Sequence, residues 1–411
     1  MQPTRRTFIA STLVAAGAMA APRVRAADKP KLKVGVLTDL SGQYRDDAGE
    51  GSITCTKQAA AEFMAANPDI AVEVVAADHQ NKPDVAVSIG REWFDRGGVD
   101  VITNCNNSAI AGAIANLAHE KNKVHVNTGA VSADLTGKNC SPNFVHWPYD
   151  TWEETHSTGG AMTRTGGKTW FCITADYVFG HNLQRDLTQA VEAGGGKVIG
   201  SVAYPFPATT DFSAQLVQAQ ASGAHVVAFC NAGGDFVNCV KQAHEFGLVE
   251  HGQKLAGMVV FTTDVQALGL ETAKGLVLTS TFYWDLNDRT RAFVKRLQKT
   301  SPGLWPNEIQ ASDYAGTLHY LKAAKALGVA QAKASGLATV NMMKKLPTDD
   351  DCFGHGMIRA DGRCIHDAYL FEVKAPAESK GAHDIWKLLA TTPGDKAFRP
   401  MADGGCKLVK A

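Results

Sequence analysis

The sequence is short of the features that mark several common classes of protein. Lys and Arg together number 41, and so do Asp and Glu, which leaves no basic excess of the kind that binds nucleic acid. No two of the nine cysteines are spaced C-x-x-C, so neither a zinc site nor a thioredoxin-like motif is indicated. After residue 26, no stretch approaches the roughly 18 apolar residues of a membrane span.

Enzyme motifs are missing as well. The chain contains no G-x-S-x-G elbow and no H-E-x-x-H. Residues 166–169, Gly-Gly-Lys-Thr, are similar to the end of a P-loop, but Met162 stands where the loop needs glycine, and a strand follows. Residues 49–51, Gly-Glu-Gly, lack the third glycine of a dinucleotide fingerprint. We therefore predict no catalytic residue, no metal site and no cofactor.

The first 26 residues have the pattern of a bacterial export signal. Arg5 and Arg6 precede an apolar, Ala-rich run from Phe8 to Ala21, and Val24 and Ala26 supply small residues for a cleavage site. The paired arginines favour the twin-arginine route, although Sec signals also carry such pairs. Removing the signal, with its four arginines and no acids, takes the net charge from 0 to about −4. We expect cleavage near Ala26 and a soluble periplasmic product.

The cysteines divide into two kinds of surroundings. Cys172 and Cys230 lie in apolar, strand-like runs, where a small buried hydrophobe is the expected role. Cys140 lies in a Lys-Asn-Cys-Ser-Pro loop, and Cys406 lies in a Gly-Gly-Cys tail. Because export permits disulfides, we predict that Cys140 and Cys406 pair and fasten the C-terminal tail.

Short apolar runs alternate with segments of helical periodicity, which predicts a parallel sheet covered by helices on both faces. The alternation begins at Lys33–Leu37 and restarts at Lys168–Thr174, after a boundary near Trp147–Trp152. The fold class is therefore α/β, with two doubly wound lobes. Residues 360–363, Ala-Asp-Gly-Arg, separate two strand-like runs and predict a hairpin.

The last third of the chain adds elements to both lobes in this interpretation. We expect the N-terminal lobe to comprise residues 31–148 and about 280–345, and the C-terminal lobe to comprise residues 149–279 and about 346–411. The chain would then cross between the lobes several times, forming a multi-crossover hinge.

Polar loops follow the expected strands, at the edge of an open α/β sheet where ligands bind. Four of them stand out: residues 39–49, 104–108, 127–131 and 175–180. Ser108 begins a helix, where its hydroxyl and the free backbone N–H groups can cap the helix, hold a carboxylate, or both. Tyr44, Tyr177 and Tyr283 are aromatic residues with polar neighbours, so we expect them in the walls of a pocket.

These loops resemble those of the periplasmic binding proteins that serve ABC importers of the branched-chain amino-acid type. The resemblance rests on residues 33–42 (KVGVLTDLSG), on Asn107-Ser108, on residues 127–130 (NTGA) and on residues 174–180 (TADYVFG), and it covers essentially the whole chain after the signal. It implies two Rossmann-like lobes joined by three crossovers and closing on a ligand. Residues 76–83 and 282–287 are similar to a subgroup in which some members take aromatic acids or other small carboxylates.

The resemblance also implies roles for individual residues. Asn107 and Ser108 match the loop that binds the ligand carboxylate, and Gly129, Ala130 and Val131 match a second carboxylate loop, with Val131 in place of a Thr. Phe179 matches a pocket aromatic, and Asp264 matches the acidic residue that pairs with a ligand amine. With Tyr44, Phe179 is expected to sandwich the apolar part of the ligand between the lobes.

We therefore expect a monomeric solute-binding protein that delivers a small carboxylate to the membrane permease of an ABC importer. The ligand is left open among aliphatic amino acids, aromatic acids and amides. One alternative is a sensor lobe that presents its ligand to a membrane signalling partner, which would need a tether or a fused domain. Another is a periplasmic amide hydrolase, which would need Ser41 or Ser108 beside a His and a carboxylate.

Overall fold

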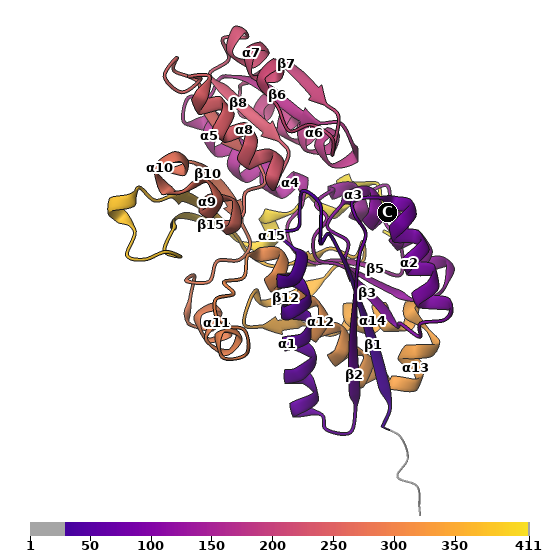
Figure 1. The fold of residues 1–411 in the computed structure, drawn as a ribbon. Coiled ribbons are helices and arrows are strands. Elements are labelled where there is room, and N and C mark those ends of the chain that lie inside the picture. Colours follow the sequence, from indigo (N-terminus) through magenta and orange to yellow (C-terminus); the bar gives the residue numbers. More distant parts are fainter. Residues whose placement is uncertain (1–28, 410–411) are drawn as a thin grey trace, which may run out of the picture.

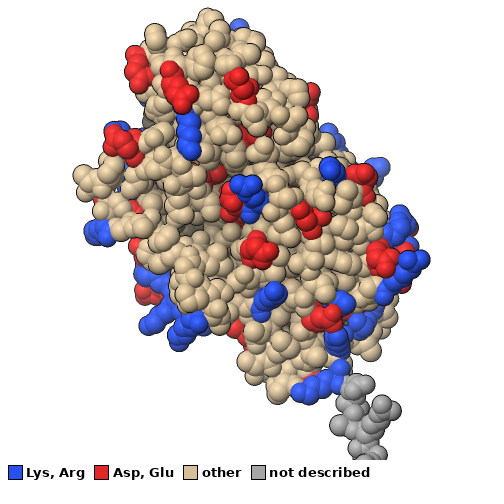
Figure 2. Space-filling view, viewed as in Figure 1, with Lys and Arg blue, Asp and Glu red and all other residues tan. Residues whose placement is uncertain are grey.

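The structure is a computed structural model that describes residues 29–409. The expected export signal lies outside the described residues. None of the helices within 29–409 is long and apolar enough to cross a lipid bilayer. Acidic and basic side chains are interspersed over the face drawn in Figure 2.

The first lobe is built on a five-stranded parallel sheet in the order β2-β1-β3-β4-β5. Its strands are β1 (Lys31–Thr38), β2 (Ala71–Asp78), β3 (Val101–Asn104), β4 (Val124–Asn127) and β5 (Phe144–His146). Helices cover both faces, as the alternating pattern predicts: α1 (Gly49–Ala66) packs on one face, and α2 (Pro83–Asp95) and α3 (Ser108–Glu120) on the other. All five strands are parallel, so their carboxyl ends meet at one edge.

The chain returns to this lobe late in the sequence, as expected. The long helix α12 (Glu308–Leu327) packs along α1, and Ala311, Tyr314 and Ala315 share one apolar core with Leu32 and Val34 of β1. The later helices are α11 (Asp288–Thr300), α12, α13 (Val329–Ala334) and α14 (Gly336–Lys345). Figure 1 shows α12, α13 and α14 beside the strands of the first sheet.

The second lobe has a four-stranded parallel sheet in the order β7-β6-β8-β9 and a separate antiparallel sheet in the order β10-β14-β15. The parallel strands are β6 (Thr169–Ala175), β7 (Lys197–Tyr204), β8 (Val226–Cys230) and β9 (Lys254–Gly257). The antiparallel strands are β10 (Val277–Ser280), β14 (Ala368–Val373) and β15 (Trp386–Thr392). The helices of this part are α4 (Thr151–Glu154), α5 (Gly160–Arg164), α6 (Val178–Ala193), α7 (Ser213–Ala221), α8 (Gly234–Glu245), α9 (Thr262–Leu268) and α10 (Leu270–Ala273).

The segment after α14 corrects the expected division of the chain. Residues 346–411 were assigned to the second lobe, but Cys352, Ile358 and Cys364 are buried in the core of the first lobe. They belong to β11 (Thr348–Asp350), β12 (Gly354–Ile358), β13 (Cys364–Ile365) and the turns between them. The chain leaves for the second lobe only at β14, which pairs with β10 in the antiparallel sheet. The predicted hairpin is confirmed between β12 and β13.

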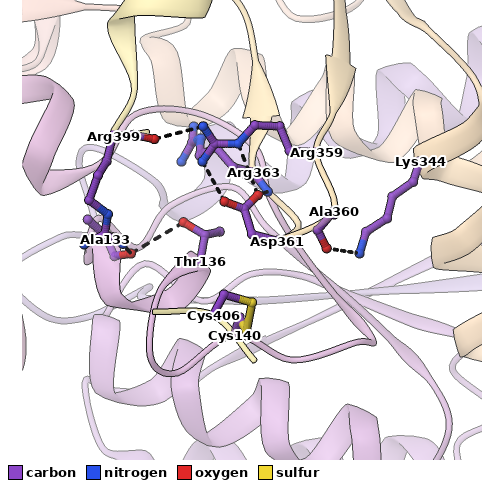
Figure 3. Close-up of a disulfide and its surroundings, with 10 residues drawn as sticks. All are labelled: Ala133, Thr136, Cys140, Lys344, Arg359, Ala360, Asp361, Arg363, Arg399 and Cys406. Atoms are coloured by element: carbon purple, nitrogen blue, oxygen red, sulfur yellow. Dashed lines mark hydrogen bonds and ion pairs between the residues drawn. A yellow bond between two sulfur atoms is a disulfide. The ribbon is translucent and has the colours of Figure 1, made fainter. Parts of the chain in front are cut away.

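The C-terminal tail also lies on the first lobe. After α15 (Gly394–Ala397), Arg399 Nη2 donates to the carbonyl of Ala133 over 2.8 Å, and the predicted disulfide between Cys140 and Cys406 is confirmed, with a Cα–Cα distance of 5.6 Å. Figure 3 shows the disulfide below the Arg399 contact. The other seven cysteines are buried thiols, as expected for Cys172 and Cys230.

Candidate functional site

A small cavity lies where the carboxyl edges of the two parallel sheets meet. Its volume is about 20 Å³, which holds about one water molecule. Seven of its lining residues were predicted from the sequence: Tyr44, Ser108, Gly129, Ala130, Val131, Tyr177 and Phe179. The two lobes are therefore closed over a site that side chains nearly fill.

The donors at this cavity come from two adjacent loops of the first lobe. The helix cap of α3 is Asn107, whose Oδ1 accepts from the N–H groups of Ala109 (2.9 Å) and Ile110 (3.2 Å). Ser108 is therefore the first residue inside the helix rather than its cap, and its own N–H has no hydrogen-bond partner among residues 29–409. Its Oγ accepts from Ser132 N–H over 3.2 Å, which leaves the hydroxyl proton free to donate into the cavity.

The second loop supplies one further donor. The N–H groups of Gly129 and Ala130 are taken by Oδ1 of Asn127, at 3.4 and 2.8 Å. The Val131 N–H has no partner in the described part of the chain. A Cβ on Gly129 would lie 2.6 Å from Cβ of Asn106, so only glycine lets the two loops approach this closely. Two backbone N–H groups and one hydroxyl, which together suit a carboxylate, therefore remain unused here.

Aromatic rings close the cavity from both lobes. The hydroxyl oxygens of Tyr44 and Tyr177 lie 2.5 Å apart, and both rings stack on Phe206, with centroid distances of 5.6 and 4.4 Å. Burial raises the pKa of both tyrosines above the usual range, so both remain neutral hydrogen-bonding groups. The ring of Phe179 lies 5.8 Å from that of Tyr177. These rings give the cavity apolar walls with hydroxyl groups at one point.

Three residues expected at the site lie elsewhere. Asn107 is occupied as the helix cap, and its Nδ2 donates to Asn81 rather than to the cavity. Tyr283 packs against Trp386 in the core of the second lobe, and its hydroxyl donates to the His383 carbonyl over 2.8 Å. Asp264 is buried behind the cavity wall, where its Oδ2 accepts from Phe261 N–H over 2.9 Å. Burial raises the pKa of Asp264 to about 7.

Other lining residues were not among the predicted site residues. Asp47, Asn106, Tyr149 and Phe261 all line the cavity. Asp47 is 1% exposed, and its Oδ1 accepts from Thr263 Oγ1 of the second lobe over 2.5 Å. Asn106 is held by two bonds to its Oδ1, from Asp39 N–H (3.1 Å) and from His79 (2.9 Å). The signal in the sequence was their position after strands: Asp47 and Asn106 follow β1 and β3, and Tyr149 and Phe261 follow β5 and β9.

Two parallel α/β lobes that share several crossings and meet over one cavity define a solute-binding protein of the type I periplasmic fold. The chain belongs to the periplasmic binding protein family, whose model matches residues 31–382. The resemblance to binding proteins of branched-chain amino-acid importers is confirmed by the solved structures that the chain is similar to.

A periplasmic binding protein from Burkholderia mallei is 44% identical, with a TM-score of 0.88, over 93% of this chain and 100% of that one. A branched-chain amino acid ABC transporter periplasmic ligand-binding protein from Burkholderia xenovorans is 37% identical, with a TM-score of 0.80, over 92% and 99%. A solute-binding protein of an ABC transporter from Rhodopseudomonas palustris, in complex with benzoate, shares the fold at 20% identity, with a TM-score of 0.76, over 92% and 99%. The chain has no match among curated proteins.

Proposed function

We propose that this protein captures a small carboxylate between its lobes and hands it to the membrane permease of an ABC importer. The observation that carries the proposal is the set of unused donors at the cavity, namely the N–H groups of Ser108 and Val131 and the Ser108 hydroxyl. A carboxylate that enters the cleft loses water and must recover hydrogen bonds, and these donors offer them. The aromatic walls favour an apolar body of limited size.

The ligand and the closure of the lobes are linked in this proposal. A cavity that holds about one water molecule has no room for a carboxylic acid, so the ligand must enter an open form and keep the lobes further apart than here. The first lobe holds the carboxylate and the second supplies Tyr177 and Phe179 as the lid. A permease would then recognise the liganded arrangement of the two lobes.

The aromatic walls make aromatic acids as well as branched-chain amino acids the ligands to test first. Solved structures that share the fold hold benzoate, 4-hydroxybenzoate and 3,4-dihydroxybenzoic acid. The direct experiment is a thermal-shift screen of both classes followed by calorimetry. A ligand at 100 times its dissociation constant stabilises the folded protein by about 2.7 kcal/mol. Binding of uncharged amides in preference to every carboxylate would contradict the proposal.

We also propose that the protein acts by binding alone, as a monomer in the periplasm after cleavage near Ala26. The geometry at Ser108 supports this, because its Oγ contacts Ser132 N–H and neither a His nor a carboxylate among residues 29–409. Ser41 Oγ donates to Asp78 over 2.6 Å but lies exposed outside the cavity. Cell fractionation with mass determination of the mature chain, together with an assay for amide and ester turnover, tests these three statements.

A further inference from the structure

Asp47 is a buried acid in the wall of the cavity with one oxygen unused. Its Oδ1 accepts from Thr263 Oγ1, and its main-chain carbonyl accepts from Asn307 Nδ2 over 2.8 Å. Its Oδ2 is buried and has no hydrogen-bond partner in the described part of the chain. A buried carboxyl oxygen without a donor is costly, so its presence in a binding cavity needs an explanation.

The surroundings of Asp47 increase the free-energy cost of burying its carboxyl group. No Lys, Arg or His lies within ion-pair distance of Asp47 or of Asp264 among residues 29–409. Burial, followed by the neighbouring Asp264, raises the pKa of Asp47 well above its ordinary value. Holding Thr263 requires only one acceptor oxygen, and an asparagine would provide that oxygen without the second one. The contacts within the protein therefore do not account for an aspartate at this position.

We propose that Oδ2 of Asp47 accepts a hydrogen bond from the ligand, so that the site selects carboxylates carrying a second, hydrogen-bond-donating group. That group is a hydroxyl or an ammonium, either of which donates a hydrogen bond that a carboxyl oxygen can accept. The inference rests on the proposed function, since it assumes that the carboxylate occupies the donors of Ser108 and Val131. An acid that lacks the donor would leave the buried oxygen unpaired, and the site would reject it.

Ligand pairs that differ only in the donor test this inference by calorimetry on the intact mature protein. One set is 4-hydroxybenzoate, benzoate and 4-methoxybenzoate, in which the methoxy group keeps the oxygen and removes its proton. The other pair is L-phenylalanine and 3-phenylpropionate, which differ in the ammonium. In one of the two sets, the donor-bearing acid should bind about tenfold or more tightly than its partner, the range for a hydrogen bond to a charged group. The set that shows this preference identifies the donor as hydroxyl or ammonium.

The variant Asp47→Asn should abolish that preference, because an amide N–H₂ then faces the donor of the ligand, while the acid without a donor binds as before. The matched control is Asp46→Asn, since Asp46 is the adjacent, exposed aspartate, which forms an ion pair with Arg45 at the surface. It should behave as the parent does. Thermal unfolding of each variant checks that the fold is kept.

The inference is overturned if the parent binds the members of both sets equally, or if Asp47→Asn keeps the full preference. If Asp47→Asn does not fold, the parent protein alone still tests the inference. Its affinities for 4-hydroxybenzoate and 4-methoxybenzoate are compared, and so are its affinities for L-phenylalanine and 3-phenylpropionate. Failure of the proposed function looks different, because the parent then binds no carboxylate in either set, and the inference falls with it.

Discussion

The hydroxyl oxygens of Tyr44 and Tyr177 lie 2.5 Å apart and join the two lobes across the mouth of the candidate binding site. Tyr44 belongs to the loop between β1 and α1, and Tyr177 precedes α6, so the contact connects corresponding loops of the two lobes. Gly234 N–H donates to the Gln43 carbonyl over 3.1 Å beside it, and Asn182 Nδ2 donates to Ser132 Oγ over 2.6 Å. These bonds hold the two lobes together in the closed arrangement.

Removing the hydrogen bond between Tyr44 and Tyr177 should raise the affinity for the ligand or leave it unchanged. The ligand must separate the two rings to enter, and the bond stabilises the closed arrangement of the lobes by about 0.5–1.5 kcal/mol. Tyr177→Phe is expected to bind the identified ligand as tightly as the parent or up to about tenfold more tightly. Calorimetry measures this, with Tyr369→Phe, on β14, as the control. A loss of more than about tenfold would mean that the ligand itself uses the Tyr177 hydroxyl.

Removing the hydroxyl of Ser108 should have the opposite effect and lower the affinity for the ligand. Ser108→Ala removes the side-chain donor but keeps the N–H groups of Ser108 and Val131, so affinity for the carboxylate should fall by about 1–3 kcal/mol. It also removes the acceptor of Ser132 N–H, so calorimetry should be accompanied by a thermal melt. Ser88→Ala changes an exposed serine of α2 and should bind as the parent does. Unchanged affinity in Ser108→Ala would place the carboxylate elsewhere.

The sequence was sufficient to predict the features that depend on local pattern, namely the strands and the polar loops that follow them. Parallel strands end at one edge of a sheet, so polar loops after apolar runs were enough to bring Ser108 and Val131 together. The sequence did not distinguish Asp47 from Asp46, because their different burial depends on Thr263 and Asn307, which lie more than 200 residues away. Tyr283 was misplaced for the same reason, since its partner Trp386 belongs to the antiparallel sheet formed late in the chain.

The disulfide should contribute strongly to stability because it joins distant parts of the chain. Cys140 and Cys406 are separated by 266 positions, and the chain-entropy model gives about 5–6 kcal/mol for so long a loop. Cys406→Ser should lower the free energy of unfolding by that order in denaturant titrations. Arg399 still bonds to Ala133, so the tail is expected to remain docked under native conditions.

Reduction provides the control for the disulfide variants. The reduced parent should match Cys406→Ser, and Cys140→Ser with Cys406→Ser should be no less stable than either single variant. Dithiothreitol should not change the stability of the double variant, because the remaining cysteines are buried thiols. Peptide mapping that finds both cysteines free in the oxidised parent would contradict the pairing.

Glu308 should make the stability of the protein depend on pH between about 4.5 and 7. Glu308 is 2% exposed at the start of α12, and its Oε2 accepts from the N–H and the hydroxyl of Thr281, each over 2.9 Å, where the chain crosses from β10 to the first lobe. Burial raises the pKa of Glu308 to about 7 from the usual 4.5. The folded state therefore holds the proton over a pH range in which the unfolded state releases it, and this contribution to stability is complete below about pH 4.5 and is lost as the pH rises through 7.

Glu308→Gln removes this titration, so its stability relative to the parent should increase with pH, by about 3 kcal/mol between pH 4 and pH 8. Urea titrations of both proteins at pH 4, 6 and 8 measure the difference, and Glu250→Gln, which changes an exposed glutamate, should follow the parent throughout. Burial also raises the pKa values of other acids, including Glu153 and Glu154, so only the difference between variant and parent is informative. A difference that stays constant from pH 4 to pH 8 would mean that the pKa of Glu308 is the same in the folded and the unfolded protein.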